Sequence, residues 1–130
     1  MFVAGRKFEY LKERMLGYEE LMKLPVMCLE GNTSTRTYVE QFLASKQVTI
    51  RPEFELATSD MLIQFAVRNL GIASVVRNFA VEHLKTGDLF ELRFSEEIPA
   101  RTFCIVANER IPLSAAAATL MNVLVQGTSQ

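Results

Sequence analysis

Short apolar runs alternate with amphipathic helical stretches along most of the chain. Val26–Leu29 is continuously apolar, as expected of a strand that is buried on both faces, and Glu30–Asn32 follows it as a turn. Thr33–Thr35 then offers N-caps for a helix that ends near Lys46 and whose apolar face comprises Tyr38, Val39, Phe42 and Leu43. The pattern predicts a first unit made of a strand, a turn and a capped helix.

The same unit recurs further along the chain. Phe54–Ala57 predicts a second short strand, and Thr58–Asp60 offers a second set of caps. The helix that follows has its apolar face at Met61, Leu62, Phe65 and Ala66. It is expected to stop near Asn69, because asparagine tolerates the left-handed conformation that closes many helices.

Further strands and helices complete the alternation. Gly71–Val76 predicts a third buried strand, Phe79–Leu84 a third helix, and Gly87–Asp88 a turn into a strand over Leu89–Phe94. Strands that alternate with helices at this spacing favour crossover connections, so we expect an α/β fold with a mostly parallel sheet flanked by helices.

The two ends of the chain have a less regular pattern. Met1–Arg6 begins at once with a strand-like apolar run, and Leu11–Leu24 predicts an irregular stretch with a helical turn at Tyr18–Lys23. Pro99–Ala107 predicts a longer strand, and Ala115–Val125 a final helix rich in alanine and leucine.

Composition limits the classes of function. A chain of 130 residues can bury one core of ordinary size. Its 14 Lys and Arg residues are balanced by 15 Asp and Glu residues and form no basic cluster, so the chain alone is not expected to bind DNA. It has neither a run of about 20 apolar residues nor a secretory leader, which predicts a cytoplasmic protein without a membrane partner.

Residues that could support catalysis or metal binding are sparse. Cys28 and Cys104 lie in apolar runs without metal-ligand spacing, which predicts two buried, reduced thiols. His83 is the only histidine and has no nucleophile motif near it, and Glu96–Glu97 is typical of a solvated turn. Nucleotide-binding and metalloprotease motifs are absent. We therefore expect no catalytic residue, metal ion or cofactor.

Three local patterns, taken in order, resemble a known family. They are Glu30–Arg36 opening a helix, Thr58–Ala73 running into a strand, and Arg101–Ile111 followed by Pro112–Ala116. Their order and spacing are similar to those of the effector-binding domain of LysR-type transcriptional regulators. The resemblance implies a periplasmic-binding-protein-like (type 2) fold of two α/β lobes.

The resemblance also implies a domain organisation for the 130 residues. Residues 16–95 would form the complete second lobe, and residues 1–6 and 99–126 would be remnants of the first lobe. The DNA-binding winged helix-turn-helix would be absent from this chain, so DNA would be bound only through that missing N-terminal domain. The full-length protein would form a homodimer or tetramer, in which the helix after Thr33 commonly pairs with a first-lobe helix of another subunit.

Candidate ligand-binding residues follow the first two predicted parallel strands. Thr33, Ser34 and Thr35 come after the first strand, and Thr58 and Ser59 after the second. Helix N-termini and hydroxyl donors suit a small anionic molecule, and the resemblance implies that effector contacts occur at these positions. Helix capping is the alternative role for these hydroxyls, and the two roles are compatible. Arg36 could add a counter-charge, although a first-turn arginine is more often on a solvated face.

Other functions remain open from the sequence. The first hypothesis is the ligand-sensing module of a bacterial regulator, with no catalysis. The alternative is a solute-binding protein or a small enzyme of the same two-lobe fold. A free-standing dimerising or modulatory domain is a third hypothesis, which would apply if Met1 is a genuine start.

Overall fold

The chain divides into two compact units in a computed structural model that describes residues 1–102 and 104–127. The first unit is Met1–Ile98 and the second is Pro99–Gln130. The second unit contains one described helix, α4 (Ala115–Gly127). All the other helices and strands of the described residues belong to the first unit.

The first unit is built on a mixed five-stranded sheet with the strand order β4-β3-β5-β1-β6. The strands β4, β3 and β5 are parallel, whereas β1 is antiparallel to both of its neighbours. A small second sheet joins β2 and β7 in parallel. The predicted α/β fold with a mostly parallel sheet is therefore confirmed. The strands are β1 (Phe2–Gly5), β2 (Met15–Leu16), β3 (Val26–Leu29), β4 (Phe54–Leu56), β5 (Ile72–Ser74), β6 (Leu89–Glu91) and β7 (Arg93–Phe94).

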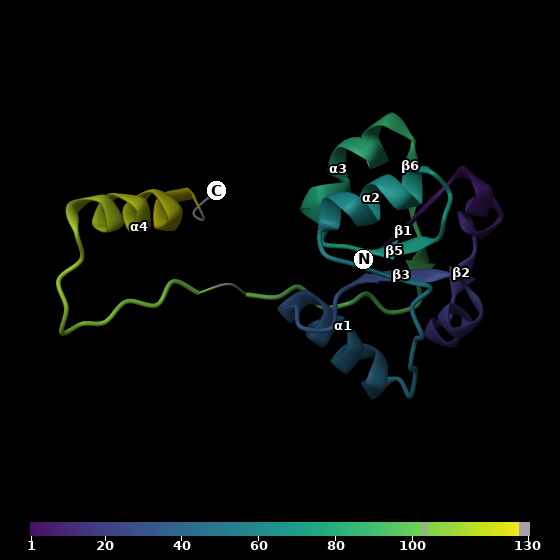
Figure 1. Cartoon of the computed structure of the whole chain (residues 1–130), viewed down its shortest axis with the longest axis horizontal. Coiled ribbons are helices and arrows are strands. Elements are labelled where there is room, and N and C mark those ends of the chain that lie inside the picture. Colours follow the sequence, from purple (N-terminus) through teal and green to yellow (C-terminus); the bar gives the residue numbers. More distant parts are fainter. Residues whose placement is uncertain (103, 128–130) are drawn as a thin grey trace. The chain divides into compact units, whose positions relative to one another are not determined.

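Helices cover both faces of the five-stranded sheet. Figure 1 shows α1 (Ser34–Ser45) on one face and both α2 (Ser59–Val67) and α3 (Arg77–Thr86) on the other. The strands bury alternate side chains in two clusters, so that Cys28 packs on the α1 face and Met27 on the α2 face. Two 3₁₀ helices, η1 (Arg6–Leu11) and η2 (Tyr18–Lys23), follow β1 and β2; the helical turn at Tyr18–Lys23 was predicted.

The position of β1 differs from the sequence-based division into lobes. Residues 1–6 were expected to belong to a different lobe from residues 16–95. In the structure, Val3 lies opposite Ala73 of β5 and Glu91 of β6, inside the sheet of the first unit. Because Phe2, Val3 and Ala4 are fully buried there, β1 is part of this core.

The helix boundaries agree closely with the capping residues in the sequence. Thr33 and Thr58 are the N-caps of α1 and α2. Asn69 follows the end of α2 in the left-handed region, with a φ of 62°. Its side-chain Oδ1 also accepts a hydrogen bond from the Lys7 N–H at 2.8 Å, which ties the end of α2 to the start of η1.

Two predicted strands differ from the structure. No strand is present at residues 99–102 and 104–107, and Phe103 lies outside the described residues. The backbone N–H and C=O groups of a strand need a neighbouring strand as hydrogen-bond partner. The described part of the second unit contains no strand that could be this partner. The strand predicted over Leu89–Phe94 is divided at Leu92, because β6 pairs with β1 while β7 pairs with β2.

The two cysteines have different environments. Cys28 is buried in the α1 face of the sheet, as predicted, whereas Cys104 is exposed and the prediction of a buried thiol there is wrong. The prediction failed because it assumed a sheet strand over Pro99–Ala107. Burial, against a weaker opposing effect of the Arg36 charge, raises the pKa of Cys28 to about 11.

We expect iodoacetamide to alkylate Cys104 and to spare Cys28 in the folded chain at pH 8. The reactive species is the thiolate, which a buried cysteine with a pKa of about 11 hardly forms at that pH. Mass spectrometry of tryptic peptides measures both sites. Both cysteines should react in about 6 M guanidinium, because the unfolded chain exposes Cys28 as well. Equal labelling of the two cysteines without denaturant would contradict the burial of Cys28.

Candidate functional site

The carboxyl ends of β3 and β4 lie side by side at one edge of the sheet. Leu29 pairs with Leu56 in parallel register, and the Glu30 N–H donates to the Leu56 carbonyl oxygen at 3.1 Å. From this edge the chain enters α1 on one face and α2 on the other face (Figure 1). In open α/β sheets, ligands usually bind beyond the carboxyl ends of adjacent strands whose following helices cover opposite faces.

Two of the predicted site residues act as helix caps. The Thr33 Oγ1 accepts a hydrogen bond from the Arg36 N–H at 3.2 Å, and its hydroxyl donates to the Glu30 carbonyl oxygen at 3.0 Å. The Thr58 Oγ1 accepts from the Met61 N–H at 3.3 Å. These interactions are the capping role that was the alternative to ligand binding, and they orient the first turns of both helices.

Ser34 and Ser59 have the same position in the two helices, one residue after each cap. Neither hydroxyl has a hydrogen-bond partner in the described part of the chain, and neither side chain is buried. Their backbone N–H groups belong to the first helical turn, where no helical carbonyl is available. Thr35 is half-buried. The two serines thus bring hydroxyl and amide donors to the two sides of the β3–β4 edge.

Arg36 is buried, so the expectation of a solvated side chain is wrong. Only 7 % of Arg36 is exposed. Its Nε donates to Glu40 at 2.6 Å, and its Nη1 donates to the Leu29 carbonyl oxygen at 2.9 Å and to Glu55 at 3.2 Å. Burial lowers the pKa of Arg36, but the carboxylates of Glu40 and Glu55 outweigh that effect and hold it above its ordinary value.

The interactions of Arg36 define its role at this edge. Its charge is balanced by two carboxylates of the same chain, and its guanidinium joins the first turn of α1 to the ends of β3 and β4. The residue therefore supports the N-terminus of α1 and is not a free counter-charge. The i,i+4 spacing of Arg36 and Glu40 is a signal of ion pairing that the sequence contains.

The end of β5 lies at the same sheet edge but offers different chemistry. The N-cap of α3 is Val76, which makes no side-chain cap, and Arg77 beside it pairs with both carboxylate oxygens of Glu91 at 2.8 and 2.9 Å. The Met1 ammonium donates to the Val75 carbonyl oxygen at 3.0 Å. Sequence reasoning did not identify this ion pair, because its two residues lie on separate elements.

His83 and Glu96, which were also singled out from the sequence, have structural partners. The His83 Nδ1 lies 3.5 Å from the Asp88 carboxylate. Glu96 is exposed and pairs with Lys46, and its carbonyl oxygen accepts from the Tyr18 hydroxyl at 2.7 Å. Over the described ranges, 1–102 and 104–127, no group of three or more metal-ligating side chains occurs. None of the helices in these ranges combines the length and the hydropathy of a membrane-spanning segment.

Comparison with known families decides the classification. The family profile described as the LysR substrate binding domain matches residues 1–129. The chain belongs to the LysR substrate-binding domain family. LysR proteins are transcriptional regulators that bind small-molecule effectors and DNA and that typically form dimers or larger oligomers.

Individual relatives of this LysR domain are distant. The HTH-type transcriptional activator CmpR of Synechocystis sp. strain PCC 6803 is 27% identical over 71 residues, which are 55% of this chain and 23% of CmpR. The LysR domain thus matches less than a quarter of that protein's length.

Solved structures share the fold of the LysR domain. The CcmR regulatory domain of Synechocystis PCC6803, in complex with 2-PG, has a TM-score of 0.76 at 16% identity, over 99% of this chain and 62% of that one. The regulatory domain of HypT from Salmonella typhimurium has a TM-score of 0.62 at 17% identity, over 96% and 58% of the two chains. At this identity the likeness establishes the type 2 periplasmic-binding-protein-like fold.

Proposed function

We propose that this chain is the ligand-sensing part of a LysR-type regulator and that it binds a small anionic effector at the carboxyl ends of β3 and β4. The observation that supports this site is the symmetric placement of Ser34 and Ser59. Both residues lie one position after a capped helix start, at neighbouring strands, with no hydrogen-bond partner in the described residues.

The chemistry of this edge favours an anion bound by dipoles. Helix N-termini have a partial positive charge and unpaired N–H groups, which stabilise a carboxylate or phosphate group. Arg36 orients the first turn of α1, and Thr33 and Thr58 hold the two helix starts in place. None of the residues at this site is a nucleophile with an adjacent base, so the proposed function includes no catalytic step.

In the whole protein, effector binding would change DNA binding through a separate N-terminal domain. A ligand shifts such an equilibrium only if its affinity for the two states differs. The proposal includes a homodimer or tetramer and a cytoplasmic location. The contact face of α1 in such an assembly would be its outer side, because Val39 and Leu43 are buried in the core of the chain.

We expect the double substitution Ser34→Ala and Ser59→Ala to weaken the binding of 2-PG, the ligand of the CcmR domain, about 10-fold. Each hydroxyl contributes roughly 0.7 kcal/mol as a hydrogen-bond donor, and 1.4 kcal/mol corresponds to a factor of ten. Titration of the ¹⁵N-labelled chain, followed by NMR, measures the change in affinity.

The matched control for this titration is Ser45→Ala. The Ser45 hydroxyl donates to the Phe42 carbonyl oxygen at the far end of α1, so its loss should leave the affinity unchanged. Equal affinity of the double variant and the parent chain would refute the placement of the site.

The role in regulation has a separate test in the DNA upstream of the Met1 codon. The proposal expects an in-frame winged helix-turn-helix followed by a linker helix and a βαβ unit. A secretory signal peptide there would instead favour a solute-binding protein of the same fold, and the regulator proposal would be rejected.

A further inference from the structure

Residues 95–98, the last four residues of the first unit, are held in place without secondary structure. β7 ends at Phe94, and the four residues after it belong to no helix or strand. Three of them are exposed, and only Ile98 packs against the core cluster on the α1 face. Because this segment lacks the regular hydrogen bonds of a sheet or helix, its position depends on individual side-chain contacts.

Tyr18 makes the first of these contacts. Its hydroxyl donates a hydrogen bond to the Glu96 carbonyl oxygen at 2.7 Å. Its ring stacks on Phe94 with the centroids 4.3 Å apart, and it meets Phe42 of α1 edge-on at 5.2 Å. Burial, together with the charges of Glu96 and Glu97, raises the pKa of Tyr18 to about 12, so the hydroxyl keeps the proton that it donates. Tyr18 thus joins residues 95–98 to α1.

Lys46 makes the second contact. It is the C-cap residue of α1, and its ammonium group pairs with the Glu96 carboxylate. The same ammonium lies 5.6 Å from the centroid of the Phe42 ring, which Tyr18 also contacts. Glu96 is therefore held twice, at its backbone by Tyr18 and at its side chain by Lys46, and both contacts lead to the C-terminal end of α1.

The position of this segment in the chain gives the two contacts their importance. Ile98 is the last residue of the first unit, and the chain enters the second unit at Pro99. α1 has 12 residues and is therefore about 18 Å long. A helix moves largely as a rigid element, so a displacement at its start also moves its end.

We propose that Tyr18 and Lys46 form a latch that couples residues 95–98 to the C-terminal end of α1. Opening the latch frees these residues without unfolding the first unit. While the latch is closed, a shift of α1 changes the point at which the chain enters the second unit. The latch needs no ligand, so this inference is independent of the proposed function.

The first test is ¹⁵N relaxation of the 130-residue chain and of its Tyr18→Phe variant. Phenylalanine retains the ring that stacks on Phe94 and loses only the hydroxyl. We expect the backbone order parameters of residues 96–98 to fall from about 0.85 to below about 0.6, while those of α1 and β3 stay unchanged. The matched control is Tyr10→Phe, because Tyr10 is an exposed tyrosine of η1 and its hydroxyl is not part of the latch.

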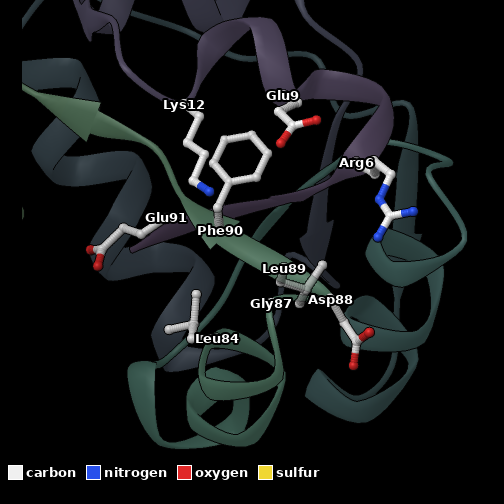
Figure 2. A pocket seen from close by; sticks show the side chains of 9 residues that line it. All are labelled: Arg6, Glu9, Lys12, Leu84, Gly87, Asp88, Leu89, Phe90 and Glu91. Atoms are coloured by element: carbon white, nitrogen blue, oxygen red, sulfur yellow. The ribbon is translucent and has the colours of Figure 1, made fainter.

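A second pair of variants separates the two contacts. Lys46→Met and Glu96→Gln remove the same ion pair and leave the Glu96 carbonyl bonded to Tyr18. Because exposed ion pairs contribute little, both variants should lower the order parameters equally and by less than Tyr18→Phe does. The control is Lys12→Met, since Figure 2 shows this lysine at a cavity between η1 and β6, among side chains that are not part of the latch.

The coupling to α1 has its own measurement. Ala44→Gly loosens the last turn of α1 at an exposed position, because glycine disfavours helix. We expect it to shift the amide resonances of Glu97 and Ile98 in the parent chain. It should not shift them in the double variant Tyr18→Phe and Lys46→Met, in which the latch is open.

Three results would overturn the latch. One is an unchanged order parameter of residues 96–98 in Tyr18→Phe. Another is loss of the folded peak pattern of the whole first unit in that variant, because opening would then be unfolding. The third is an equal response of Glu97 and Ile98 to Ala44→Gly with the latch intact and with it open. None of these results bears on the titration with 2-PG, which tests the effector site separately.

Discussion

Replacement of Arg36 by methionine is expected to lower the free energy of unfolding by about 3 kcal/mol, the lower end of the range for removing one partner of a buried ion pair. The Leu29 carbonyl loses a hydrogen-bond partner, and Glu40 and Glu55 lose their common cation. The lower end applies because the two carboxylates are 46% and 50% exposed and regain water. Guanidinium denaturation followed by circular dichroism measures the loss.

The control for this substitution is Arg68→Met. Arg68 is the exposed C-cap residue of α2 and bonds only to Gln64 through its side chain in the described part of the chain, so its replacement should change stability by less than about 0.5 kcal/mol. Similar losses for the two variants would show that Arg36 does not connect α1 with the ends of β3 and β4.

The second large effect is expected for Leu62→Ala, with a loss of about 3 kcal/mol of unfolding free energy. Leu62 is fully buried between α2 and the sheet, so truncation removes apolar contacts and leaves a cavity. The same denaturation measurement applies. Met61 is the neighbouring control, because its side chain is 43% exposed and Met61→Ala should stay within about 0.5 kcal/mol. A loss at Leu62 no larger than at Met61 would contradict the packing of α2 on the sheet.

Much of the first unit could be predicted from local patterns. Val26–Leu29 is a strand with the predicted bounds, and Thr33 and Thr58 cap the helices that follow the strands. These features depend on residues close in sequence. For example, each capping hydroxyl accepts a hydrogen bond from the backbone N–H three residues later. Asn69 also has the predicted left-handed conformation.

The rest depends on partners that are distant in sequence. β1 was placed in a different lobe, because no local pattern shows that it pairs with β5 and β6. The burial of Arg36 depends on Glu55, which is on another element, and the expected strand at Pro99–Ala107 lacks a described partner. At the candidate site, the sequence predicted the five hydroxyl residues, but the capping bonds of Thr33 and Thr58 single out Ser34 and Ser59 as the available donors.

The interior position of β1, between β5 and β6, has a consequence for biosynthesis. A ribosome makes Val3 long before its two partners, Ala73 and Glu91, so β1 stays unpaired until almost the whole first unit has left the exit tunnel. Contacts so distant along the chain also slow folding, because a long loop must close before they form. The nascent chain therefore exposes an unpaired apolar strand for most of its synthesis, a state that favours aggregation.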